Sequence, residues 1–185
     1  MEKFVLIDRD GVITVRQDQP IKSVDDLTFL PFVQESFLEF ERNGINLVVL
    51  VNSPAPGEVE IAPDVLNEMN NVLHSHMDEV GAHIFEIMVG PQKAQEAKRC
   101  RFPNPSLLKD AAKKFGFSLA STYFICASLE SLQAAWNAGC KSAFVRTGKP
   151  YQTMQFLQTS EKQPDFITKD ILSAALKITA AYRSS

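Results

Sequence analysis

The amino-acid sequence predicts an α/β fold in which a mostly parallel sheet carries helices on both faces. Short apolar runs rich in β-branched or aromatic residues recur along the chain, and longer segments with helical periodicity separate them. A glycine follows four of these helical segments. Strands that alternate with helices of roughly 10 to 18 residues are typical of βαβ units. The order of the segments therefore favours a parallel sheet over a helical bundle or a sandwich.

The predicted strands are short and apolar along their whole length, as expected of strands buried on both faces. They are residues 4–7, 46–51, 84–89, 123–126 and 142–145. The predicted helices combine apolar periodicity with a glycine stop directly after them. They are residues 33–43, 63–80, 107–115 and 129–138. Residues 169–182 are predicted as a closing helix, whereas the polar stretch 149–164 gives no clear assignment.

Length and composition indicate an ordinary folded protein. A chain of 185 residues predicts one domain over residues 1–185. Hydrophobic residues make up 45% and charged residues 22%, which excludes a disordered chain, a collagen-like fibre and a disulfide scaffold. The 19 Lys and Arg against 22 Asp and Glu give a net charge of -3, so no basic excess is present to bind a nucleic acid backbone.

The start of the chain and its cysteines predict a cytoplasmic location and no membrane partner. The first apolar run ends at Asp8, which is too short for a signal peptide core or a membrane span. The three cysteines form no CxxC pair and are odd in number, so free thiols are expected. They are Cys100, Cys126 and Cys140.

Two carboxylates follow the first predicted strand and are the strongest chemical signal in the sequence. Asp8 and Asp10 lie two residues apart and Gly11 follows them. Ligands of parallel sheets bind outside the carboxyl ends of the strands. One carboxylate there suits attack on phosphorus and the other proton transfer to a leaving oxygen, with a divalent cation to neutralise phosphate charge. Two solvated charges at a strand end are the alternative interpretation.

The sequence resembles the haloacid dehalogenase (HAD) superfamily of phosphatases, and within it the D,D-heptose bisphosphate phosphatase and histidinol phosphatase group. The likeness covers roughly residues 4–148, and its landmarks occur in family order. They are residues 6–13, 29–31, 47–52, 100–105 and 128–140. The resemblance implies a Rossmann-like, HAD-type fold with a minimal cap.

The resemblance also implies catalytic roles for particular residues. The family residue that matches Asp8 attacks phosphorus to form an aspartyl phosphate and binds magnesium. The one that matches Asp10 acts as general acid and then as general base. Asn52 and Arg101 match further site residues, and Asp8 and Asp10 are the expected Mg²⁺ ligands.

Four positions depart from the family pattern. Val51 stands where a hydroxyl is expected, and Phe102 stands where a lysine stabilises the phosphoryl charge. Loss of one such electrostatic donor typically costs about 100 to 1000-fold in rate. Ala127 and Ser131 replace the two aspartates that complete the magnesium site, while Glu130 is one residue out of register. Mg²⁺ binding is therefore expected to be weak.

Two loops of the family pattern are altered as well. The loop at residues 53–58 carries two prolines, which lack N–H donors, and a glutamate where a phosphate site favours a cation. The zinc loop that the group often carries keeps only Cys100, and one thiol cannot build a tetrahedral site. We therefore expect no zinc, and a more apolar mouth at this edge of the sheet.

Two functions remain open at this stage. The first is a pseudophosphatase that acts in binding or regulation, with an unknown protein partner or a small phosphorylated metabolite as its ligand. The second is an active Mg-dependent phosphohydrolase that uses Asp8 and Asp10. Its substrate would be a sugar phosphate of the heptose bisphosphate type or a compound like histidinol phosphate.

Overall fold

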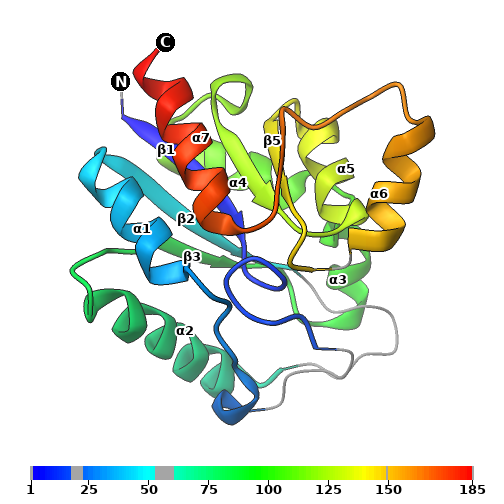
Figure 1. Ribbon diagram of the computed structural model, residues 1–185. Helices are drawn as coiled ribbons and strands as arrows, with labels where there is room; N and C mark the ends of the chain where they lie inside the picture. Colours follow the sequence, from blue (N-terminus) through cyan, green and yellow to red (C-terminus); the bar gives the residue numbers. More distant parts are fainter. Residues whose placement is uncertain (1, 18–22, 53–60, 149, 185) are drawn as a thin grey trace.

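One parallel sheet forms the centre of the molecule (Figure 1). The computed structural model describes residues 2–17, 23–52, 61–148 and 150–184. Within these ranges six strands pair in the order β3-β2-β1-β4-β5-β6, and every pairing is parallel. The strands are β1 (Lys3–Asp8), β2 (Ile45–Val51), β3 (Glu86–Val89), β4 (Tyr123–Cys126), β5 (Lys141–Val145) and β6 (Phe166–Thr168).

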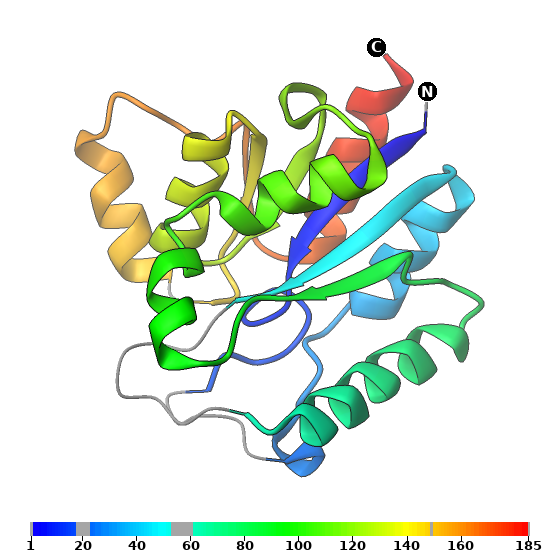
Figure 2. The same ribbon diagram turned by 180° about the vertical axis from the view of Figure 1, so that it is seen from behind.

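Helices cover both faces of this sheet, as the sequence predicts (Figures 1 and 2). One face carries α1 (Val33–Arg42), α2 (Pro63–Asp78) and α7 (Ile171–Arg183). The other face carries α4 (Ser106–Phe115) and α5 (Leu129–Ala138), with α6 (Pro150–Thr159) beside them. The remaining helices are short: α3 (Ala94–Cys100), η1 (Val24–Asp26) and η2 (Leu119–Ser121).

The central strand β1 explains why the helices divide in this way. Side chains alternate between the two faces of a strand. Val5 and Ile7 therefore belong to the hydrophobic cluster under α1 and α7, whereas Phe4 and Leu6 belong to the cluster under α4 and α5. All four are at most 3% exposed, so β1 is buried on both faces. This burial is the physical reason for the continuous apolar run that predicts the strand.

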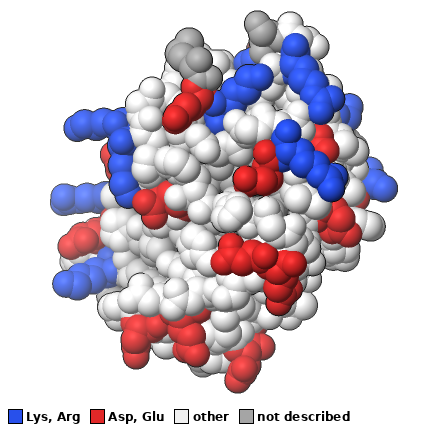
Figure 3. Space-filling view, turned by 90° about the vertical axis from the view of Figure 1, so that its left-hand side faces the viewer, with Lys and Arg blue, Asp and Glu red and all other residues white. Residues whose placement is uncertain are grey.

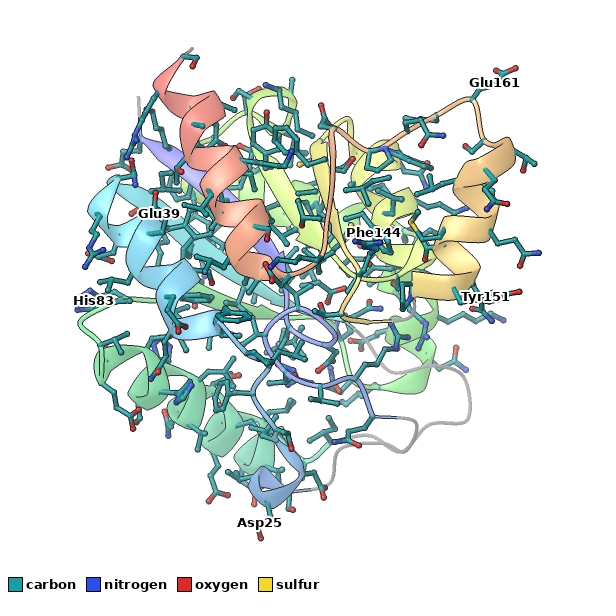
Figure 4. All side chains as sticks on the ribbon, viewed as in Figure 1. Asp25, Glu39, His83, Phe144, Tyr151 and Glu161 are labelled. Carbon is teal, nitrogen blue, oxygen red and sulfur yellow. The ribbon has the colours of Figure 1, made fainter. Side chains whose placement is uncertain are left out.

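Several elements of the described chain have no counterpart in the sequence analysis or begin at a different residue. Helix α6 occupies most of the polar stretch 149–164, and β6 and α3 were not predicted. Strand β3 begins at Glu86 rather than at residue 84. Figure 4 shows Tyr151 of α6 at the outer edge of the molecule, exposed to solvent, whereas Phe144 of β5 lies in the interior.

Charged side chains are unevenly distributed on one side of the molecule. Figure 3 shows Asp and Glu side chains over much of this face, including its lower end, whereas the Lys and Arg side chains seen in this view lie above that end. In the described part of the chain, no helix has the length and hydropathy needed to cross a membrane.

Candidate active site

The candidate site lies where the strand order changes direction. The chain builds β1, β2 and β3 outward on one side and then returns to place β4, β5 and β6 on the other. Asp8 ends β1 and Ala127 directly follows β4, so both lie at the carboxyl ends of these adjacent strands. Such a switch point is where open parallel sheets bind their ligands. The fold therefore places the predicted nucleophile position in a suitable location.

Asp8 is an unusual carboxyl group because it is almost completely buried. It is 5% exposed, and desolvation raises its pKa from the ordinary 3.8 to about 7, with a further upward contribution from the Asp10 charge. Three smaller effects lower the pKa of Asp8: the positive charge of Arg16, a hydrogen bond with Ser131, and the positive charge of Arg9. Without a bound cation, Asp8 is therefore protonated in a large share of molecules at neutral pH.

Asp10 is held by its neighbours in a closed set of contacts. Arg9 donates from Nε to Oδ1 of Asp10 at 2.8 Å and from Nη2 to Oδ2 at 3.0 Å, and Thr14 Oγ1 donates to Oδ1 at 3.2 Å. The Arg9 side chain is 3% exposed, so Asp10 is the counter-charge of a buried guanidinium. A general acid must carry a proton that it can release. In this structure both carboxylate oxygens of Asp10 are instead engaged by hydrogen bonds from Arg9 and Thr14.

The turn after β1 explains this arrangement. Gly11 adopts a φ of 89°, in the left-handed region that favours glycine, and its N–H donates to the Thr14 carbonyl at 2.7 Å. The amides of Ile13 and Thr14 both donate to the Arg9 carbonyl, at 2.9 and 3.0 Å. The chain therefore reverses within a few residues, which places Thr14 against Asp10.

Asn52 and the segment around Phe102 meet at the end of β2. The Phe102 amide donates to Oδ1 of Asn52 at 3.1 Å, and the Phe102 ring packs against Phe124 with the ring centroids 5.7 Å apart. Phe102 is 3% exposed and belongs to the hydrophobic core. Arg101 is the half-buried residue directly before it, at the end of α3. The structure therefore brings Asn52 and Arg101 to the same edge as Asp8.

The end of β4 presents a helix cap in place of carboxylates. Ala127 is 1% exposed, and Ser128 and Ser131 form a capping box at the start of α5. Their hydroxyl oxygens are 2.8 Å apart, and the Ser131 amide donates to Oγ of Ser128 at 3.2 Å. Glu130 is exposed to solvent. The hydroxyls of Ser128 and Ser131 therefore serve as the cap of α5, and neither position carries a carboxylate.

The turn after β5 closes tightly over these residues. Thr147 Oγ1 donates to the Gly11 carbonyl at 2.6 Å. A Cβ added to Gly148 would press on the Ala127 carbonyl oxygen and lie 2.7 Å from the Ala127 Cβ. Glycine is therefore required at position 148 for reasons of space, because no positive φ is recorded for it.

We expect Gly148→Ala to lower the free energy of unfolding by about 2 to 3 kcal/mol, as in other overpacked sites. Gly116→Ala is the matched control, since Gly116 has a φ of 73° but open space around its Cβ position. That control should cost only about 1 kcal/mol of backbone strain. Urea denaturation of both variants measures the difference, and equal losses would show that the contact with Ala127 is not tight.

Comparison with known proteins places these features in a family. Residues 99–174 match the model of the HAD-hydrolase-like family. The D-glycero-β-D-manno-heptose-1,7-bisphosphate 7-phosphatase of Escherichia coli K12 is 31% identical over 155 residues, which cover 79% of this chain and 80% of the relative. The chain belongs to the HAD-like hydrolase family. The corresponding phosphatase of Bordetella bronchiseptica is 27% identical over 152 residues, 82% of this HAD-like chain and 85% of that protein.

Solved structures of HAD-like phosphatases support the fold. The D,D-heptose 1,7-bisphosphate phosphatase of B. bronchiseptica, complexed with magnesium and phosphate, aligns with a TM-score of 0.87 at 24% identity. The alignment covers 97% of this chain and 99% of that one. The phosphatase from Burkholderia thailandensis aligns with a TM-score of 0.73 at 26% identity, over 95% and 97% of the two chains. The predicted Rossmann-like, HAD-type fold is confirmed.

The donor set of this HAD-like chain fits a magnesium ion poorly. Mg²⁺ prefers octahedral oxygen ligation with one or two carboxylates. Asp8 is available, but Asp10 is engaged by Arg9 and Thr14, and Ala127 offers no side-chain oxygen. Among the described residues, no three His, Cys, Asp or Glu side chains gather in a group that could hold a metal.

Sequence reasoning missed the contributions of Arg9, Thr14 and Arg16. The sequence analysis assigns no role to Arg9, although a charged residue next to a buried apolar run is a signal for a buried ion pair. Nothing in the sequence reveals that Thr14 and Arg16 return to the first motif, because the turn hydrogen bonds place them there. The loop at residues 53–58 lies outside the described residues, and the absence of zinc stays a prediction.

Proposed function

We propose that this HAD-like protein binds a small phosphorylated metabolite at the carboxyl edge of its sheet and hydrolyses it slowly or not at all. It would then act in binding or regulation in the cytoplasm, and a protein partner is the alternative to the metabolite as its ligand. The observation that carries the proposal is the capped end of β4, where Ala127 and the Ser128–Ser131 box stand in place of carboxylates. The Arg9–Asp10 ion pair supports it, because it engages the predicted general acid.

Weak metal binding is the first expected consequence. We expect Mg²⁺ to bind no tighter than the millimolar range. The first motif offers two carboxylates, and Asp10 is already hydrogen-bonded to Arg9, which leaves Asp8 as its available metal ligand. Isothermal titration calorimetry measures this affinity. Removal of divalent cations should also leave the melting temperature unchanged, because only a ligand that binds the folded state shifts it. Micromolar binding that disappears in Asp8→Asn would contradict the proposal.

Phosphatase assays test the proposal directly. We expect little or no hydrolysis of heptose bisphosphate, other sugar phosphates or histidinol phosphate, because Phe102 and Val51 supply neither a cation nor a hydroxyl to the developing charge. Asp8→Ala is the control for contamination, since any activity that survives it comes from another enzyme. Robust turnover that Asp8→Ala abolishes would refute the proposal.

An active Mg-dependent phosphohydrolase is the second candidate. The comparisons favour it more directly than the first, because the relatives from E. coli and B. bronchiseptica are themselves named as heptose bisphosphate phosphatases. In this chain Asp8 would attack phosphorus, and Asp10 would have to leave Arg9 to transfer a proton. A strong dependence of turnover on Mg²⁺ would distinguish this candidate from the first.

A further inference from the structure

We propose that the outer face of helices α1 and α7 is a dimer interface, at which a second copy of this chain sets its α7 against α1 and its α1 against α7. The proposal goes beyond the proposed function, because it concerns a helical face of the molecule and not the carboxyl edge of the sheet. Neither phosphate binding nor turnover enters into it.

Hydrogen bonds fix how α1 and α7 lie side by side (Figure 1). Thr179 Oγ1 donates to Oε1 of Glu39 at 3.1 Å, and Arg183 Nε donates to Oδ1 of Asn43 at 2.9 Å. Both bonds join residues that are 140 positions apart in the chain. The two helices therefore run in the same direction, and each residue of α1 lies level with the residue of α7 whose number is higher by 140.

An apolar strip runs along the outer side of this helix pair. Leu176 is 52% exposed, and Phe32, directly before α1, is 47% exposed. Leu172 is half-buried, and it lies level with Phe32 and one turn before Leu176. None of the three belongs to the two hydrophobic clusters of the described core. Exposed apolar side chains that gather in this way, with charged residues around them, mark interaction surfaces.

The two helices carry net charges of opposite sign. Three glutamates and one arginine give α1 a net charge of -2, whereas one lysine and one arginine give α7 a net charge of +2. These residues are Glu35, Glu39, Glu41, Arg42, Lys177 and Arg183. Glu35 and Lys177 are both exposed, and neither forms an ion pair with another described residue. They are the charges with which a second copy can pair.

A two-fold axis parallel to the helices makes this face complementary to itself. It sets α1 of each copy against α7 of the other, so an acidic helix faces a basic one twice, and it sets the apolar strip against its own copy. Such an axis leaves heights along the helices unchanged. Lys177 lies level with position 37, so Glu35 of one copy and Lys177 of the other are about 3 Å apart along the helix direction.

The same charges disfavour the other two-fold arrangement of this face. An axis in the interface but perpendicular to the helices sets α1 against α1 and α7 against α7, so that like charges face each other. The charge pattern therefore selects a second copy of the chain as the occupant, and it selects one orientation.

The size of the face predicts a reversible dimer. Helix α7 has 13 residues and is about 20 Å long. Two helices packed about 10 Å apart present a face about 20 Å wide. The flat footprint of about 400 Å² per copy is smaller than the roughly 800 Å² of a standard stable interface. We therefore expect a Kd between about 10 and 100 µM.

Sedimentation velocity measures this association in the full-length protein. The mean mass of the wild type should rise with concentration between about 1 and 500 µM and should level off at two chains, because a two-fold interface is closed. A protein that stays monomeric over this range, or that grows beyond two chains, would overturn the proposal.

A charge swap tests which helices face each other. Glu35→Lys and Lys177→Glu should each weaken self-association by about tenfold or more, since each places like charges opposite one another twice. An equimolar mixture of the two variants should associate as the wild type does, because both pairs in the mixed dimer again join a lysine and a glutamate. Restoration also shows that both variants are folded.

Substitutions in the apolar strip test its part in the interface. Leu176→Ala should weaken the dimer by about tenfold. Phe32→Gly should act in the same direction without disturbing the turn, because Phe32 has a φ of 66°, which glycine adopts freely. Tyr151→Ala is the matched control, since Tyr151 is 79% exposed on α6, away from this face, and the substitution should leave the Kd unchanged.

The remaining outcomes decide the matter in the same way. A mixture that associates no better than the single charge variants would exclude the pairing of α1 with α7. Equal dimerisation by Leu176→Ala and the wild type, with both folded by circular dichroism, would exclude the apolar strip and overturn the proposal. Failure of the proposed function has a different signature, namely Mg-dependent turnover that Asp8→Ala abolishes.

Discussion

Replacement of Asp10 by alanine is expected to lower the free energy of unfolding by about 3 kcal/mol, even though Asp10 is partly exposed. The Arg9 side chain is 3% exposed, and among the described residues Asp10 is the one carboxylate to which it is hydrogen-bonded. The variant removes that counter-charge. Nη1 of Arg9 already has no hydrogen-bond partner in the part of the chain that the structure describes. Loss of one partner from a buried pair typically costs about 3 to 5 kcal/mol, and access of water to Asp10 places the expected loss at the lower end. Thermal denaturation should show a fall of roughly 6 to 12 °C for a chain of this size.

A double-mutant cycle separates this effect from general damage. Arg9→Met combined with Asp10→Ala removes both charges, and its stability should lie within about 1 kcal/mol of the wild type. The exposed Lys114–Glu86 pair is the matched control, with nitrogen and oxygen 2.9 Å apart against 2.8 Å in the Arg9–Asp10 pair. Glu86→Ala should cost less than about 1 kcal/mol. If Asp10→Ala proves no more costly than Glu86→Ala, the Arg9–Asp10 pair does not have the structural role described above.

Replacement of Asp8 by asparagine is expected to have the opposite effect and to stabilise the protein at pH 8. Burial raises the pKa of Asp8 to about 7 in the folded state, so the folded protein holds a proton that the unfolded chain releases near pH 4. The stability that Asp8 contributes is therefore complete below pH 4 and is lost as the pH rises to about 7. The loss amounts to about 4 kcal/mol in total.

Asparagine does not titrate, so it escapes this loss. The stability gain of Asp8→Asn should be below about 1 kcal/mol at pH 4 and should approach about 4 kcal/mol at pH 8, or about 10 °C in melting temperature. Denaturation curves at several pH values, all in EDTA, measure the gain. A constant difference between the two proteins across this range would mean that Asp8 does not titrate in the folded state as its burial indicates.

Much of the fold follows from local sequence signals that burial makes necessary. The apolar runs at β1 and β4 predict these strands because both strands are buried along most or all of their length. Helix α5 matches its predicted bounds from Leu129 to Ala138. The missed elements lack such signals. In α3 only Ala97 is buried among the residues whose burial is described, and β6 has three residues, which is too short for a period to appear.

The candidate site follows from the sequence only in part. The positions of Asp8, Asn52 and Arg101 follow from the ends of the elements that precede them, and the structure brings these residues to one edge. Their roles in catalysis stay predictions, as does the single domain over residues 1–185. The partners of Asp10 depend on a reversal of the chain at Gly11, and tertiary hydrogen bonds rather than propensity determine where that reversal leads.

The two ends of the described chain are tied together far from the candidate site. Lys3 Nζ donates to the Tyr182 carbonyl at 2.8 Å, and Tyr182 Oη donates to the Phe4 carbonyl at 2.8 Å. Figure 1 shows both ends on the side opposite the turn that follows β1. A dye, an affinity tag or a sensor surface can therefore be attached at either end while the carboxyl edge of the sheet stays open to ligands. Because the ends are adjacent, a short linker between them also makes circular permutation of this protein feasible.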